Sequence, residues 1–384
     1  MEKIVSYAKK VTMLELFYDL VYVLAVAKAT AIIHHLHNGV VGVESYVKFI
    51  IVCAILMLMW FGETVYINKY GEDTRGDRIG LLLHMLGVIY ITNNITTEWR
   101  ETFVPFNVTA IAMTIVVMLQ YGTKAKKFKE VSMIVKDIKV QMAILVLEVG
   151  GLSIALGVGY NIGAWITSIA YLSAMVLPAV IKSRESMHEN PINFPHLVER
   201  VSLITIIIFG EMIVTVAGTF KNDRFGLTEM VIFATVGSLF YTYWLVIEEI
   251  VDERQKTRGF LLRYSHIGMF VGLSTITVCF SFPIEQVDLR FLVHFRLLGL
   301  GIFYVSLMGI ASYNKDKYKM HVGIGLGYFM LLGVLVVITL MMRTDSRLVL
   351  NSLMFLNVAA MTVYVEAFKL ICDKKALKSD NSQL

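Results

Sequence analysis

Residues 322–342 read VGIGLGYFMLLGVLVVITLMM, a stretch without any charged side chain. At a rise of about 1.5 Å per residue, a helix of this length spans roughly 30 Å, which matches the hydrocarbon core of a lipid bilayer. Lipid offers no hydrogen-bond partner to backbone N–H and C=O groups, so a segment that crosses it alone must be helical. The stretch therefore predicts one transmembrane helix.

Eleven further apolar runs of similar length occur in the rest of the chain. Of its 384 residues, 57% are hydrophobic and 17% are charged, against about 45–50% and about 25% in soluble domains. The strands of a β-barrel would instead alternate over segments of about ten residues. We predict an all-α integral membrane protein with about twelve transmembrane helices. The predicted spans are Leu14–Leu36, Tyr46–Asn68, Arg78–Ile95, Val104–Tyr121, Val140–Val158, Ile162–Ile181, Leu197–Ala217, Leu227–Ile250, Phe260–Phe282, Leu289–Ser312, Val322–Met342 and Leu348–Ile371.

The positive charges of the connections predict the topology. Connections on one side of the predicted bundle hold 25 Lys and Arg residues, and those on the other side hold 6. Because Lys and Arg accumulate in cytoplasmic loops, we expect both termini to lie in the cytoplasm. The net charge of +5 fits this asymmetry, so it does not indicate nucleic-acid binding. The expected partner is the lipid bilayer itself.

The two halves of the sequence carry similar motifs in the same order. A Phe-Tyr-Asp run ends at Asp19 in the first predicted helix, and a Phe-Gly-Glu run ends at Glu211 in the seventh. His84 lies early in the third helix and His266 early in the ninth. An even number of helices in each half gives a parallel arrangement, which predicts two parallel six-helix repeats; chance similarity among apolar helices is the alternative. The predicted domains are residues 1–190 and 191–373 as repeats and 374–384 as a disordered cytoplasmic tail.

Ionisable side chains within the predicted spans are the candidate functional groups, because a charge inside a bilayer is costly. Helix rise places Asp19 and His84 at a similar depth, about 10 Å from the cytoplasmic side. A carboxylate and an imidazole at low dielectric can hold a proton or bind a cation. We therefore expect Asp19 and Glu211 to bind an ion or a proton, with His84 and His266 as their partners. The expected supporting residues are Glu15, Glu63, Glu148, Arg200 and Glu248.

The same groups also have structural interpretations. Asp19 and Glu211 could pair with a basic residue and only hold the bundle together, and the candidate cations for this role are Lys28, Arg200 and Arg296. The two histidines could be neutral and bonded to a carbonyl oxygen. The acids near helix ends could be solvated, and these are Glu63, Glu248 and Glu249.

The other reactive residue types point to no metal or catalytic site. Cys53, Cys279 and Cys372 are scattered and fit a packing role better than a zinc site or a disulfide framework. The single His-His-Leu-His run at residues 34–37 looks like one histidine box of a di-iron membrane enzyme, but the predicted topology places it outside, so we interpret it as an interfacial cluster. We expect no cofactor, no metal and no catalytic residue.

Two blocks of sequence resemble one known family. Residues 12–23, TMLELFYDLVYV, resemble the opening of the bacterial low temperature requirement protein A family, and residues 196–211 resemble its His-x-x-Glu-Arg…Thr-Ile-Ile-x-x-Gly-Glu stretch. The chain has Tyr18 and Tyr22 where the family usually has Phe. The resemblance extends over nearly the whole chain. It implies a multi-pass protein of the bacterial cell membrane, linked to growth at low temperature, and it implies no defined reaction.

Three functions fit these observations. The favoured hypothesis is a transporter or channel for a small solute or cation, with proton coupling as one form of it. The runner-up is a membrane-embedded enzyme that acts on a lipid or isoprenoid substrate, although no catalytic set is recognisable. A membrane sensor or scaffold is disfavoured because the connections are short. A homodimer is compatible with all three.

Overall fold

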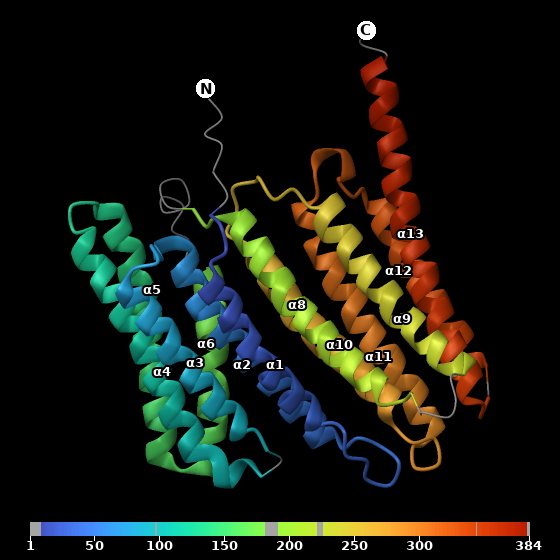
Figure 1. Ribbon diagram of the computed structural model, residues 1–384, viewed down its shortest axis with the longest axis horizontal. Helices are drawn as coiled ribbons and strands as arrows, with labels where there is room; N and C mark the ends of the chain where they lie inside the picture. Colours follow the sequence, from blue (N-terminus) through green and yellow to red (C-terminus); the bar gives the residue numbers. More distant parts are fainter. Residues whose placement is uncertain (1–8, 97, 181–190, 221–225, 343, 382–384) are drawn as a thin grey trace. The chain divides into compact units, whose positions relative to one another are not determined.

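The computed structural model describes residues 9–96, 98–180, 191–220, 226–342 and 344–381. These residues form twelve long helices and no named strand; Figure 1 shows how the helices lie along the chain. The helices are α1 (Met13–Ala31), α2 (Val43–Tyr70), α3 (Arg75–Asn93), α4 (Trp99–Lys127), α5 (Ser132–Val158), α6 (Tyr160–Val180), α8 (Phe194–Ala217), α9 (Leu227–Trp244), α10 (Phe260–Ser281), α11 (Leu289–Gly309), α12 (Val322–Met341) and α13 (Arg347–Asn381). Three short elements complete them: a π-helical turn η1 (Leu245–Ile250) and the 3₁₀ turns η2 (Ile310–Tyr313) and η3 (Asp316–Tyr318).

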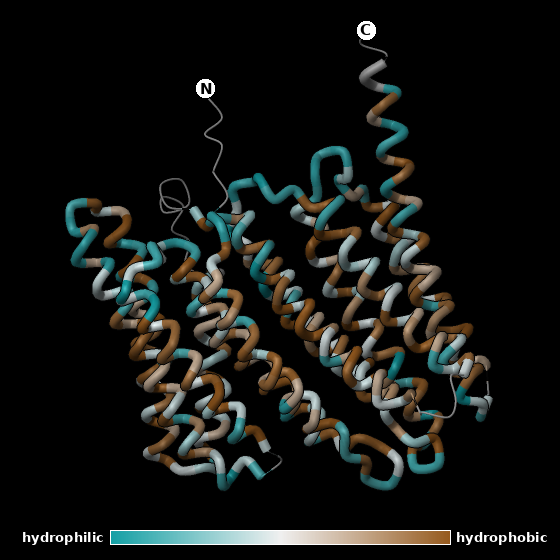
Figure 2. The backbone as a smooth tube through the Cα atoms, viewed as in Figure 1, coloured by the Kyte–Doolittle hydropathy of each residue, from teal (hydrophilic) through white to brown (hydrophobic). Residues whose placement is uncertain are grey.

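Ten of the helices among the described residues are long and apolar enough to cross a bilayer. The remaining two, α1 and α3, are more polar: α1 carries Glu15, Asp19 and Lys28, and α3 begins with a charged turn. Figure 2 shows hydrophobic residues along the middle of the helices and hydrophilic residues at their ends and in the connections. The prediction of a multi-pass, all-α membrane protein is confirmed.

Most helix boundaries differ from the predicted ones by a few residues, and two differences change the interpretation. The first predicted span reaches Leu36, but α1 ends at Ala31, and a short loop follows in which His37 and Val40 pair. The sequence also predicts disorder from residue 374, whereas α13 continues to Asn381. Its last turns contain good helix formers such as Lys, Ala and Leu, which explains why a polar stretch remains helical. Residues 382–384 lie outside the described part.

The chain divides into two compact units. The first comprises Met1–Ile32, Glu44–Ile204 and Arg254–Arg263, and so includes α1 to α6 and the start of α8. The second comprises Ile33–Val43, Thr205–Glu253 and Tyr264–Leu384. The predicted division after residue 190 and the internal repeat stay predictions.

Each unit is built from helices that pack side by side. In the first unit α1 packs on α3, α3 on α4, and α4 on α5, which also contacts α6. In the second unit α9 packs along α13, and α12 contacts both α11 and α13 (Figure 1). Small residues permit the closest approaches: a Cβ atom at Gly272 of α10 would lie 2.8 Å from the backbone nitrogen of Phe303 in α11.

Candidate functional site

The start of α1 places two acids on one helical face of the first unit. Thr12 caps the helix: its Oγ1 accepts from the backbone N–H of Glu15 at 3.3 Å, while its own backbone N–H donates to Glu15 Oε1 at 3.2 Å. This reciprocal capping box fixes the Glu15 side chain. Asp19 follows one turn later on the same face. Both acids are 2% exposed.

The start of α8 places a histidine and an arginine in the same way. Asn193 precedes the helix, and its Oδ1 accepts from the backbone N–H of His196 at 3.2 Å, as an N-cap side chain does. Arg200 lies one turn beyond His196, so the two side chains share a face. Both are completely buried.

The guanidinium of Arg200 joins the two acids. Its Nε and Nη2 donate to the two oxygens of Asp19 at 3.0 and 2.7 Å, and its Nη1 donates to Glu15 Oε2 at 2.6 Å. The indole N–H of Trp60 donates to Asp19 Oδ1 at 2.7 Å. The guanidinium also lies over the Trp60 ring, 5.2 Å from its centroid. We call Glu15, Asp19, His196 and Arg200 the Arg200 cluster.

The hydrogen bonds around His196 fix the orientation of its ring. The backbone of Asn193 donates to Asn68 Oδ1 and accepts from Asn68 Nδ2, each at 2.8 Å, which fixes the orientation of that amide. Asn68 Nδ2 lies 3.0 Å from His196 Nδ1. On the other side of the ring, His196 Nε2 lies 2.9 Å from Glu15 Oε2. His196 thus links Asn68 of α2 to Glu15 of α1.

The Arg200 cluster joins two carboxyl groups to one guanidinium, and Lys9 adds a second cation that interacts electrostatically with Glu15. Removing charges from water is expensive even when they are well paired. Protonation of either acid, or binding of a cation beside it, would therefore change a buried and closely paired set of charges.

A pocket of about 150 Å³ opens beside the cluster at the ends of α1, α2 and α3. Several charged residues line it, although most of the surface they expose there is apolar; the lining comprises Lys9, Thr12, Leu14, Glu15, Ile67, Gly71, Glu72, Asp73, Asp77, Arg78 and Leu81. Lys9 Nζ donates to the carbonyls of Ile67 and Gly71 at the end of α2, and burial lowers the pKa of Lys9. Glu15 thus connects the pocket with the buried cluster.

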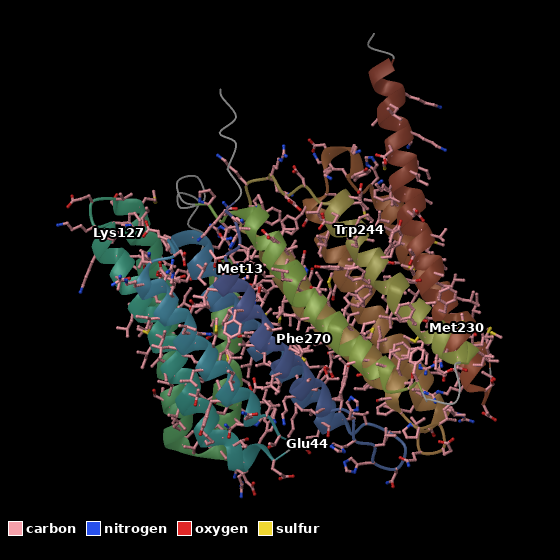
Figure 3. All side chains as sticks on the ribbon, viewed as in Figure 1. Met13, Glu44, Lys127, Met230, Trp244 and Phe270 are labelled. Carbon is pink, nitrogen blue, oxygen red and sulfur yellow. The ribbon has the colours of Figure 1, made fainter. Side chains whose placement is uncertain are left out.

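An ion-pair network borders this pocket. Lys124 donates to Glu72 at 3.0 Å and to Asp77 at 3.1 Å, and Lys127 donates to Glu72 at 2.6 Å. Figure 3 shows Lys127 at the end of α4 and Met13 at the start of α1. The hydrogen bonds from Lys127 and Lys124 hold the pKa of Glu72 below its ordinary value.

The structure gives Asp19 and His84 different partners from the expected ones. His84 is buried and lies on α3, which packs against α1, but its Nδ1 is bonded to Tyr18 OH at 3.1 Å. Tyr18 OH in turn lies 3.2 Å from Tyr22 OH. Asp19 pairs with Arg200 instead. Of the three cations considered for this acid, the structure selects Arg200.

Glu63 and Glu148 are buried acids of the first unit that have no ion pair among the described residues. Glu63 is completely buried, which excludes the solvated interpretation; its Oε1 accepts from Gln120 at 3.0 Å, and its Oε2 has no partner within the described part of the chain. Glu148 accepts from Thr114 at 3.0 Å. Both remain candidates for carrying a proton.

The expected residues of the second unit lie in different surroundings. Glu211 is partly exposed, and no hydrogen bond or ion pair joins it to a described residue. His266 is buried, and its Nε2 lies 3.1 Å from Tyr243 OH. Glu248 is exposed, in agreement with the solvated interpretation, while Glu249 pairs with Lys369 at 3.4 Å. The structure does not bring these residues into a cluster like that of the first unit.

Residues expected to be inert or interfacial can also be placed. Cys53 and Cys279 are buried and unpaired, as packing residues are, while Cys372 is partly exposed. His34 Nδ1 lies 3.4 Å from Ser281 Oγ. Within the described ranges, no group of three or more His, Cys, Asp or Glu residues is arranged to hold a metal ion.

Sequence reasoning missed His196, Trp60 and Asn68 as members of the site or its immediate support. A signal for His196 exists, because His196 and Arg200 repeat in the second resemblance block the four-residue spacing that Glu15 and Asp19 have in the first. The structure shows that these two blocks meet in the Arg200 cluster.

Comparison with known proteins gives one clear result. The family model described as bacterial low temperature requirement A protein (LtrA) matches residues 10–368. No curated protein matches the chain. The matched range includes both blocks that supply the Arg200 cluster.

Proposed function

From the premise that this chain belongs to the bacterial LtrA family, we propose that it is a proton-coupled transporter of a small solute or cation. The observation that carries the proposal is the buried Arg200 cluster, in which one guanidinium joins two carboxylates, beside a pocket that Glu15 and other charged residues line. Buried ionisable groups in membrane helices are typical of proton and ion pathways.

The two acids have different roles in this proposal. Glu15 lines the pocket and receives the proton or cation first. Asp19 lies one turn further along α1 and accepts three hydrogen bonds, two of them from Arg200. Arg200 contacts both carboxylates, so a change of charge at either acid changes its interactions. Neutralisation of one acid would weaken the ion pair between that acid and Arg200, and the guanidinium could then move.

The finer arrangement belongs to the same proposal. The charge asymmetry of the connections supports cytoplasmic termini, and in that orientation the pocket opens toward the cytoplasm. The recurring acid and histidine motifs support two parallel six-helix repeats, with Glu211 and His266 as the second site. The family description supports a role in growth at low temperature.

The alternative is that the cluster only joins α1 to the start of α8. Asp19→Asn distinguishes the two. An Asn oxygen in the position of Oδ1 keeps the bonds from Trp60 and Arg200 Nη2, and Arg200 keeps Glu15 as a counter-charge. We expect a folded protein that has lost pH-dependent flux of protons, Na⁺ or K⁺ in proteoliposomes.

The assay uses a pH-sensitive dye trapped in the vesicles and imposed H⁺, Na⁺ and K⁺ gradients. Glu101→Gln is the matched control, because it makes the same chemical change at an exposed position of α4 and should transport as wild type. Trp60→Phe removes one hydrogen bond to Asp19 and leaves all charges, so it should alter the pH dependence without abolishing flux. A folded Asp19→Asn protein that transports as wild type under every gradient would overturn the proposal.

A further inference from the structure

Arg296 of α11 is a buried cation of the second unit, 6% exposed, that no described acid neutralises. Its Nη2 donates to the carbonyl of Cys279 at 3.3 Å. Its Nε and Nη1 are buried and have no hydrogen-bond partner in the described part of the chain. A guanidinium in this state has lost its hydration without receiving acceptors in exchange, which is costly.

A second arginine and an unsatisfied amide lie in the same region. Arg347, at the start of α13, interacts electrostatically with Arg296 and donates to the carbonyl of Phe280 at 3.4 Å. Asn351 is one turn further along α13 and 1% exposed, and neither its Nδ2 nor its Oδ1 has a partner among the described residues. Like charges and unused donors therefore occur together where no described acid balances them.

Arg296 lines a pocket within the second unit that is open on one side and whose enclosed part measures about 10 Å³. Asn357 and Thr339 add polar groups to its wall and are bonded to each other at 2.9 Å. The rest of the lining is apolar and comprises Val293, Leu297, Leu300, Leu350, Leu353 and Met354. The enclosed part takes about one water-sized group, so an ion that reaches Arg296 would place one oxygen there and its remaining atoms in the open part of the pocket.

Helix capping explains only part of this arrangement. The carbonyls of Cys279 and Phe280 belong to the last turn of α10, where cations are favourable. Each arginine is bonded to one such carbonyl. Capping leaves two nitrogens of Arg296 unused and gives no role to Asn351.

We propose that this pocket binds a small oxyanion, a carboxylate or a phosphate, through the guanidinium of Arg296. The planar fork of the guanidinium matches two oxygens of such a group, and its free Nε is one of the two nitrogens that a side-on carboxylate or phosphate contacts. Arg347, which interacts electrostatically with Arg296, adds positive charge near the pocket. The proposal is independent of the proton site of the first unit.

The test measures thermal unfolding of the purified protein in detergent with inorganic phosphate or acetate, against chloride at equal ionic strength. A ligand that binds only the folded state raises the unfolding temperature in a concentration-dependent way. We expect the apparent affinity for the oxyanion to fall at least tenfold in Arg296→Gln. Arg290→Gln is the matched control, because Arg290 lies on the same helix and is exposed.

The oxyanion could be free in solution or could be the phosphate of a lipid headgroup, and a second measurement separates these sources. Native mass spectrometry compares the phosphatidylglycerol retained by wild type and by Arg296→Gln after delipidation and re-addition of that lipid. A shift with inorganic phosphate supports a free ion, and selective loss of the lipid from Arg296→Gln supports a headgroup. If a folded Arg296→Gln matches wild type in both measurements, the site does not exist.

Discussion

Two buried arginines, one in each unit, have opposite electrostatic surroundings. Arg200 is fully buried and donates to two carboxylates at distances from 2.6 to 3.0 Å. Arg296 is 6% exposed and donates one hydrogen bond, to the carbonyl of Cys279 at 3.3 Å. The first arginine is paired with two carboxylates, and the second carries positive charge that no described acid balances. A buried arginine is therefore evidence of an anion site only when its counter-charges have been counted.

The comparison also bears on the predicted repeat. Asp19 and Glu211 occupy similar places in the sequence of the two halves, yet Asp19 is buried against Arg200, whereas Glu211 is partly exposed and has no ion pair with a described residue. If the halves are repeats, their first helices have taken different roles. An acid at an equivalent position does not suffice for an equivalent site.

The largest effect should follow from Arg200→Leu. This change leaves Glu15 and Asp19 buried at close range without a counter-charge, and breaking a buried pair in this way costs about 3–5 kcal/mol. We expect little folded protein, as measured by monodisperse elution and by thermal unfolding in detergent.

A double variant tests the cause. Adding Asp19→Asn to Arg200→Leu removes one of the two negative charges that have lost their counter-charge. The double variant should therefore lose less stability than the sum of the losses in the two single variants. Additive losses would mean that Arg200 stabilises the protein through packing and not through charge.

A much smaller effect is expected from Arg296→Met, although this arginine is also buried. No described acid is left unpaired, and an apolar side chain of similar length fills the space, so the free energy of unfolding should change by less than about 1 kcal/mol in phosphate-free detergent, with stabilisation as an acceptable result. Thermal unfolding of both proteins checks this. A loss as large as that of Arg200→Leu would show that Arg296 is already neutralised and would erase the contrast between the units.

The smallest effect concerns the ion pairs of the partly exposed Glu72 with the buried Lys124 and the exposed Lys127. These bonds lower the pKa of Glu72 from 4.5, so their stabilisation is complete above that value and disappears as the pH falls through the lowered pKa. Solvent screening limits it to less than about 1 kcal/mol. Near pH 7 the wild type should unfold at a slightly higher temperature than Glu72→Gln, and the two unfolding temperatures should converge in acid. A difference in unfolding temperature that grows as the pH falls would contradict this prediction.

The sequence predicts the helices well because long apolar runs have few alternatives in a bilayer. It also predicts Asp19 as a buried acid, and the depth of His84 relative to α1. It does not predict which side of α1 each helix faces: adjacent residues are rotated by about 100° around a helix, so His84 reaches Tyr18 while Arg200 reaches Asp19. Depth follows from residue number, but rotation follows from packing.

The partners from α8 could not be chosen for a related reason. Arg200 is 181 residues from Asp19, and Lys28 and Arg296 were equally reasonable partners until the fold was known. The orientation of the His196 ring depends on the amide of Asn68 and the backbone of Asn193, a contact between α2 and the residue before α8. No local pattern encodes such a contact.

Trp60 gives the first unit an intrinsic optical reporter. Of the four tryptophans, it is completely buried, while Trp165 and Trp244 are 67% and 39% exposed. Its indole nitrogen lies 2.7 Å from the carboxylate of Asp19, so a proton or cation that changes the charge there changes the electric field on the chromophore. The emission spectrum of unlabelled protein should therefore follow the charge state of Asp19 in real time, and Trp60→Phe supplies the background from the other three tryptophans.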